Sequence, residues 1–306
     1  MDANQVSKTA MGTAFMRAYH AANDHPRIFD DFLAQHLITA EELRIIEERH
    51  LAAFQRFDPA GAASCPDRAS ALACWMRGGG APAIVFSRAR YTEDILESAV
   101  RQQEVKQYVI LGAGMDTFAF RRPDLLVRLH VFEVDHPGTQ AHKRRRLREV
   151  GREHPAQLHF IPVDFSRENL AEALGRSAYD SQASSFFNWL GVTYYLTREA
   201  AFATLRAIAE VAPPGSTVIF DYLDSEAFVP ERAARRVQIM MQLVERVGEP
   251  MLTGFDPASL AADLGSLGLR LQEDLSPADI EARFFEGRMD GYHACEHAHL
   301  ARATVV

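Results

Sequence analysis

Cysteine is scarce in this chain of 306 residues: it has three, Cys65, Cys74 and Cys295, and none of them are in CxxC spacing. An odd number of widely spaced thiols does not make a disulfide framework, and free thiols are typical of a reducing compartment. The N-terminus lacks a basic start followed by an apolar segment, and no uninterrupted apolar run approaches the roughly 18 residues that span a bilayer. The sequence therefore predicts a cytoplasmic protein that is neither exported nor inserted in a membrane.

Basic residues are also fewer than acidic ones. The 41 acidic and 33 basic side chains give a formal net charge of −8, which repels phosphate backbones and anionic membranes. One basic run, residues 143–146, falls in a helix-length segment, and we interpret it as a solvated helix face. Neither nucleic acid nor a membrane is expected as a partner.

The pattern of apolar residues changes along the chain. Residues 1–87 are predicted to form a helical cap, because Ile46, His50 and Phe54 recur at helical spacing behind a capping-box pattern at Thr39. Two segments rich in glycine and proline, 58–66 and 78–82, are predicted to be loops, with a helix from about residue 91 to 103. We interpret the apolar stripe of this cap as packing either in the protein core or in a lid.

From residue 88 onward, short apolar runs alternate with helix-length segments, which indicates βαβ units and a mostly parallel sheet. The expected strands are 108–111, 129–134, 158–163, 185–187, 217–222, 269–273 and 300–305. Residues 224–255 interrupt the alternation with a methionine- and valine-containing helical stretch, which is predicted either as core or as a lid inserted over the site. The prediction is a Rossmann-like α/β domain, 88–306.

A strand running directly into a GxG turn is the most informative motif. The run from Tyr108 to Leu111 leads into Gly112, Ala113 and Gly114, where glycine allows a ligand to approach the backbone closely. A dinucleotide fingerprint places a third glycine at position 117, which is threonine here. This absence argues against a nicotinamide cofactor without eliminating it.

Acidic residues end the next two predicted strands. Asp135, about 20 residues after the turn, can accept hydrogen bonds from both ribose hydroxyls, and Glu133 on the same side of the strand is the alternative. Asp164 beside Phe165 suits an adenine, whose amino group can donate to the carboxylate while its face stacks on the ring. Ligands bind at the carboxyl ends of strands in such sheets, so we expect these residues to form one site.

These segments resemble a known family. LGAGMDT at 111–117, EVDHP at 133–137 with Lys143 following, VDFS at 163–166 and GVTYYLT at 191–197 are similar to the leucine carboxyl methyltransferase family. More narrowly, they resemble its bacterial branch of S-adenosylmethionine-dependent O-methyltransferases. The resemblance extends from about residue 88 to the C-terminus, and it implies the class I methyltransferase fold with a seven-stranded sheet.

The resemblance also implies roles for individual residues. Gly112 with its neighbours would hold the methionine portion of S-adenosylmethionine, Asp135 the ribose, and Asp164 with Phe165 the adenine. An arginine upstream of the first strand binds the cofactor carboxylate in the family. Arg88 matches it best and Arg90 follows closely, since a guanidinium pairs with a carboxylate in a bidentate fork.

One position departs from the family. A glutamate that helps to hold the cofactor usually precedes the Gly-Val pair after the fourth strand, and this chain has Leu190 there. Cofactor contact at Leu190 would have to come from backbone groups or from Asn188. Tyr195, a little further on, is expected either to face the acceptor or to pack in the core.

The resemblance predicts transfer of a methyl group to an oxygen of a small molecule or peptide. A carboxylate acceptor needs no general base, whereas a phenol or alcohol does, and His136, His142 and His159 are open candidates for that base. Two rival functions remain at this point, a nicotinamide-dependent oxidoreductase and a catalytically silent S-adenosylmethionine-binding module.

Histidine and cysteine alternate near the C-terminus, at His293, Cys295, His297 and His299, which would place all four on one face of an extended segment. Methyl transfer requires no metal, and histidine is common in loops and at strand edges. We therefore interpret this row as ordinary structure and expect no metal site.

Overall fold

The computed structural model describes residues 6–102, 104–164 and 168–306. Its centre is a seven-stranded sheet in the order β3-β2-β1-β4-β5-β7-β6. Every strand predicted from the sequence is present, with ends that differ by at most two residues. The strands are β1 (Gln107–Leu111), β2 (His130–Asp135), β3 (Leu158–Pro162), β4 (Ser185–Trp189), β5 (Thr217–Leu223), β6 (Leu269–Leu275) and β7 (Ala298–Val305).

The pairing pattern places the carboxyl ends of β1, β2, β3, β4 and β5 at one edge of the sheet, because these strands are mutually parallel. β7 is antiparallel to both β5 and β6. The strand order reverses between β1 and β4, and a crevice opens at such a switch point in open α/β sheets. This topology is that of the class I methyltransferase fold.

Helices cover both faces of the sheet and form a separate cap. The described helices are α1 (Lys8–Asn23), α2 (Ala40–Phe57), α3 (Pro59–Ser64), α4 (Arg68–Gly78), α5 (Gly80–Arg101), α6 (Phe118–Arg121), α7 (Pro123–Leu126), α8 (Pro137–Glu149), α9 (Leu170–Gly175), α10 (Arg198–Val211), α11 (Arg235–Arg246), α12 (Pro257–Ser266) and α13 (Pro277–Phe284), with short 3-10 segments η1 (Ala34–Leu37), η2 (Thr193–Tyr195) and η3 (Ser225–Phe228).

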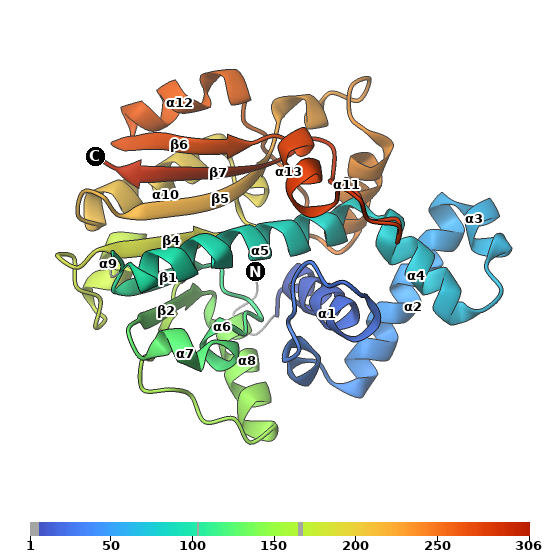
Figure 1. The fold of residues 1–306 in the computed structure, drawn as a ribbon, viewed down its shortest axis with the longest axis horizontal. Coiled ribbons are helices and arrows are strands. Elements are labelled where there is room, and N and C mark those ends of the chain that lie inside the picture. Colours follow the sequence, from blue (N-terminus) through green and yellow to red (C-terminus); the bar gives the residue numbers. More distant parts are fainter. Residues whose placement is uncertain (1–5, 103, 165–167) are drawn as a thin grey trace.

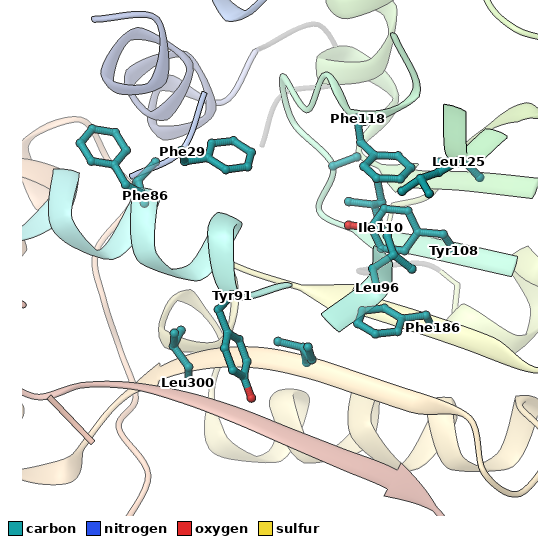
Figure 2. Packing of buried hydrophobic residues seen from close by; sticks show 14 of the residues in the cluster. Phe29, Phe86, Tyr91, Leu96, Tyr108, Ile110, Phe118, Leu125, Phe186 and Leu300 are labelled. Carbon is teal, nitrogen blue, oxygen red and sulfur yellow. The ribbon is translucent and has the colours of Figure 1, made fainter. Parts of the chain in front are cut away.

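Two buried clusters explain the layers. On one face, residues of α5, α6, α7 and α13 pack with those of the sheet, and Figure 2 shows Leu96, Tyr108, Ile110, Phe118 and Phe186 packed together there. On the other face, α9, α10 and α12 pack against the alternate residues of the same strands. The strands are thus buried on both sides, as expected of a parallel sheet.

α5 joins the cap to the sheet. Figure 1 shows α1 to α4 gathered beside the sheet, with α5 running between the two parts. Along this helix, Phe86 packs near Phe29 at the cap end and Leu96 packs against the sheet (Figure 2). The expected boundary between residues 87 and 88 therefore falls inside a continuous helix, and the division of the chain there remains a prediction.

Both predicted loops in the cap were wrong. Gly79 precedes α5, and Pro82 lies in the first turn of that helix, where no intrahelical N–H bond is lost. Likewise, Asp58 caps α3 by accepting a hydrogen bond from Gly61 N (2.9 Å), and Pro59 opens the helix. Proline in a first turn and glycine before it start helices as readily as they form loops.

Residues 224–255 leave the sheet after β5 and return to it at the same place, because Asp224 and Phe255 form an isolated parallel bridge. The segment carries η3 and α11. His297 fixes it: Nδ1 lies 2.9 Å from Asp224 Oδ1, and Nε2 accepts a hydrogen bond from Ala234 N at the start of α11 (3.1 Å). α11 is therefore held over the carboxyl-end side of β5.

The row of alternating histidines and Cys295 does not come together as a ligand set. Cys295 is buried against Gly80, where an added Cβ would lie 2.7 Å from the thiol sulfur. Within residues 6–102, 104–164 and 168–306, no group of three or more histidine, cysteine or acidic side chains has a metal-binding arrangement. Over the same residues, no helix has the length and apolarity needed to cross a membrane.

Candidate active site

The glycine turn after β1 is tied to the neighbouring strand. The backbone N–H groups of Gly112 and Ala113 both donate to Val134 O, at 2.8 and 3.3 Å. Gly112 has φ +69°, and a Cβ there would lie 2.6 Å from Val192 Cγ2. Gly114 also has positive φ, +51°. The turn thus requires glycine for its conformation and for the close approach of the loop that follows β4.

Asp135 closes the same turn from the tip of β2. Its carboxylate accepts hydrogen bonds from Gly114 N and from His136 N, the latter at 2.6 Å. Burial raises the pKa of Asp135 above its ordinary value, although both backbone bonds act in the opposite direction. An ionised carboxylate has about four acceptor positions, so two remain available to hydroxyl donors.

Glu133, the alternative to Asp135, is not at the tip. It is buried, and its Oε2 pairs with Nζ of Lys143, which is equally buried, at 2.5 Å. Burial raises the pKa of Glu133 to about 7, against the opposing effect of the lysine charge. The interpretation of residues 143–146 as a solvated face was therefore wrong for Lys143, while Arg144 and Arg145 are exposed.

The cap holds the other side of the turn. Arg17 of α1 donates to Met115 O (2.7 Å) and pairs with Asp31 (2.8 Å). Thr117, which stands where a dinucleotide fingerprint has its third glycine, donates its hydroxyl to the buried Asp31 (2.6 Å). Thr117 therefore has a structural role: its hydroxyl links the loop after β1 to the cap.

Arg88 is brought to the tip of β4. Its Nη1 donates to Asp221 Oδ2 in β5 (2.7 Å) and to the hydroxyl of Tyr194 (2.8 Å). Asp221 Oδ1 accepts the backbone N–H of Gly191 (2.6 Å). A Cβ on Gly191 would lie 2.6 Å from Nη2 of Arg88, so the guanidinium lies flat against the glycine.

Arg88 and Asp221 form a buried ion pair. Their side chains are 10% and 1% exposed. Burial acts to lower the pKa of Arg88, but the Asp221 charge, the interaction with Tyr194 and the hydrogen bonds to both residues together hold it above its ordinary value. No hydrogen bond of Arg88 Nη2 is formed within the described part of the chain. Arg90, the second candidate, lies on the surface and pairs with Asp94 (2.8 Å).

Two further predicted positions are placed differently. Leu190 is half-buried and packs against the core cluster that includes Tyr108 and Ile110. Asn188 points into the same core, where Nδ2 donates to the Tyr108 hydroxyl (2.7 Å). Asp164 follows β3 at the shared strand edge, whereas Phe165 lies outside the described residues.

A cavity of about 590 Å³ lies between the cap and α11. Its walls come from α1, α2, α4, the start of α5, the segment after β4 and α11, and it reaches Arg88, Tyr194 and Tyr195. It adjoins the glycine turn, because Ala10 of α1 would lie 3.2 Å from a Cβ on Gly114 while the following turns of α1 line the cavity. A space of this size suits a drug-sized ligand.

His50 is the histidine in this cavity wall. Its Nδ1 accepts a hydrogen bond from Trp75 Nε1 (3.1 Å), and its ring stacks on Phe15. Burial lowers its pKa to about 4, so the ring is neutral at physiological pH and Nε2 carries the proton. The apolar stripe of α2, which includes Ile46, His50 and Phe54, therefore lines the cavity.

The three histidines considered as general bases lie elsewhere. His136 caps α8 by accepting from Gly138 N (3.2 Å), and His142 is buried beside Arg145 (2.8 Å). His159 is near the amino end of β3, 3.1 Å from His130. The cavity lining includes none of the three.

Sequence reasoning missed Asp221, Tyr194 and His50. Asp221 had a readable signal, since an isolated carboxylate within the apolar run 217–222 requires a buried partner. His50 had none, because a histidine in an apolar helical stripe looks the same in a cavity wall as in a core.

The arrangement fits an adenosyl ligand. The Asp135 carboxylate retains acceptor capacity, and Nη2 of Arg88, which makes no hydrogen bond within the described residues, is available to a carboxylate. Leu190 contributes no polar side chain to this set.

Comparison with known proteins gives concordant results. The model of the family described as leucine carboxyl methyltransferase matches residues 10–209, so the match includes most of the cap and strands β1 to β4. A relative in Bacillus subtilis (strain 168), named "Putative S-adenosyl-L-methionine-dependent methyltransferase YktD", is 37% identical over 99% of both chains. A Mycolicibacterium gilvum relative with the same descriptive name is 31% identical, covering 72% of this chain and 67% of its own.

Solved structures support the fold alone. The crystal structure of a DUF574-family protein from Streptomyces avermitilis covers 99% of both chains at 12% identity, with a TM-score of 0.63. One from Thermobifida fusca, titled as a putative methyltransferase, covers 85% of this chain and 92% of its own at 12% identity, with a TM-score of 0.55.

Proposed function

Because the chain belongs to the leucine carboxyl methyltransferase family, we propose that it methylates an oxygen, that of a carboxylate, on a small molecule or peptide. The broader activity is established: the chain is an S-adenosylmethionine-dependent methyltransferase, by its family and by its full-length relative. The family membership therefore argues against the alternative of a nicotinamide-dependent oxidoreductase. The single observation that supports the carboxylate assignment is that the described lining of the cavity beside the glycine turn offers no ready general base. Its one carboxylate, Asp58, caps α3, and its one histidine, His50, accepts a hydrogen bond from Trp75 and has a pKa lowered by burial to about 4.

The cofactor roles follow from position. Asp135 would accept the ribose hydroxyls and Asp164 the adenine amino group. The backbone of Gly112, Ala113 and Gly114 would lie along the methionine portion, and Arg88 would bind its carboxylate through Nη2. Leu190 would contribute only backbone groups.

S-adenosylmethionine, when bound, supplies an electrophilic methyl group on a sulfonium. An acceptor carboxylate oxygen forms the new C–O bond as the S–C bond breaks and its electron pair stays on sulfur. The sulfonium and the carboxylate become a neutral thioether and a neutral ester, and no proton is released. The protein's part is therefore to align the acceptor and to exclude water, with Tyr195 facing the acceptor from the cavity wall.

The test uses methyl-labelled S-adenosylmethionine with pooled carboxylic and phenolic metabolites, followed by mass spectrometry. We expect a labelled product that releases labelled methanol in mild alkali, as a methyl ester does. A label that survives alkali would overturn the carboxylate assignment in favour of an ether. Tight binding of S-adenosylhomocysteine with no labelled product from any acceptor would favour a catalytically silent module.

A further inference from the structure

The cavity between the cap and α11 has an unusual charge balance for this molecule. Its lining includes five cationic residues and a single carboxylate, although the whole chain has a net charge of −8. The cations are Lys8, Arg49, Arg88, Arg235 and Arg236, and the carboxylate is Asp58.

Three of these cations have no acidic partner within the described residues. Arg88 is paired with Asp221, and Arg236 lies 3.2 Å from Glu296. By contrast, Lys8 Nζ and Arg235 Nη2 contact only backbone carbonyls, of Val247 (3.4 Å) and Phe57 (2.7 Å). Arg49 makes no hydrogen bond or ion pair in the described part of the chain. The Glu249 carboxylate accepts the backbone N–H groups of Lys8 and Thr9 (3.1 Å each) but does not pair with the Lys8 ammonium, and the lining itself has more cations than anions.

The rest of the wall is apolar. Aromatic side chains line it from α2 and α4, among them Phe54, Phe57 and Trp75, and aliphatic ones such as Ile239 and Leu243 line it from α11. His50 adds a neutral ring rather than a charge, because burial lowers its pKa to about 4. Such a wall stabilises a ligand chiefly through the burial of its apolar surface.

We propose that the acceptor is an apolar acid: a small molecule with a large hydrophobic body, enclosed between the cap and α11, whose negative charge is attracted by Lys8, Arg49 and Arg235. This inference rests on the proposed function and names its substrate class. A hydrophobic body complements the wall, and an anion complements the unpaired cations, whereas a neutral or cationic molecule of the same shape leaves them uncompensated.

A matched pair of probes tests the charge requirement: 1-naphthylacetate and the uncharged 1-naphthylacetamide, which share shape and apolar area. Calorimetry with the protein saturated with S-adenosylhomocysteine should show the acid binding about tenfold or more tightly, the effect of one or two charge-assisted hydrogen bonds. In the triple variant Lys8→Gln/Arg49→Gln/Arg235→Gln the preference should fall to within about twofold, with the amide affinity unchanged.

Two further variants complete the design. Leu243→Trp fills the cavity and should weaken both probes, whereas Arg206→Gln, an exposed arginine of α10 away from the cavity, should change neither. Equal affinity for acid and amide, binding of neither probe, or an acid preference that survives Lys8→Gln/Arg49→Gln/Arg235→Gln would overturn the inference. S-adenosylhomocysteine binding is measured separately, so its failure would count against the proposed function and not against the cavity.

Discussion

Replacing Asp221 with asparagine should sharply destabilise the protein, because it removes the charge that compensates the buried Arg88. The two groups are 2.7 Å apart and almost excluded from solvent. Arginine cannot relieve the imbalance by losing its proton. Breaking a buried pair by removing one partner costs about 3–5 kcal/mol. Asparagine Oδ1 can still accept the Gly191 N–H, but its Nδ2 would face the donor Nη1 of Arg88, so the loss combines the missing charge with the missing acceptor.

The assay is urea denaturation of Asp221→Asn, with the slope of the transition checked for constancy. Asp94→Asn is the matched control on α5: it breaks the exposed pair with Arg90 (2.8 Å), which is worth roughly 0–1 kcal/mol. The double variant Arg88→Met/Asp221→Asn should lose less than the sum of its two single changes. If the free energy of unfolding of Asp221→Asn is within about 1 kcal/mol of that of wild type, the description of this ion pair is wrong.

Three other predictions concern the turn and the cavity. Gly112→Ala should lose more unfolding free energy than Gly151→Ala, because both have positive φ (+69° and +67°) but only the former adds a Cβ that clashes at 2.6 Å; equal losses would contradict this. Thr117→Val should lose about 1–3 kcal/mol by leaving Asp31 short of a hydrogen bond, and denaturation showing no loss would count against the tether. In wild type, the depressed pKa of His50 contributes stability above pH 6.5 that is lost toward pH 4, up to about 3 kcal/mol. His50→Phe should flatten that dependence in urea titrations, and an unchanged profile would refute the assignment.

Much of the sheet could be predicted from the sequence, because each strand is a short apolar run buried on both faces. The turn at Gly112 and the carboxylate of Asp135 could be placed for a related reason: parallel strands bring their carboxyl ends to one edge. These features depend on local pattern and on topology alone.

The remaining features depend on tertiary contacts that no local pattern encodes. Lys143 lies in a basic run, yet it is buried because Glu133 of β2 lies beneath it. Asp221 pairs with an arginine 133 positions earlier in the chain. The cavity is assembled from helices as far apart in the chain as α1 and α11, so its lining could not be predicted from any one segment.

Calorimetry with S-adenosylhomocysteine tests the central claim most directly, that the tips of β1, β2 and β3 bind one adenosyl ligand. Wild type should bind it in a 1:1 complex, and Asp135→Asn should bind about tenfold or more weakly, because hydrogen bonds to a charged acceptor contribute about 1.5–3 kcal/mol. No binding by wild type, or the same affinity in Asp135→Asn, would contradict the account.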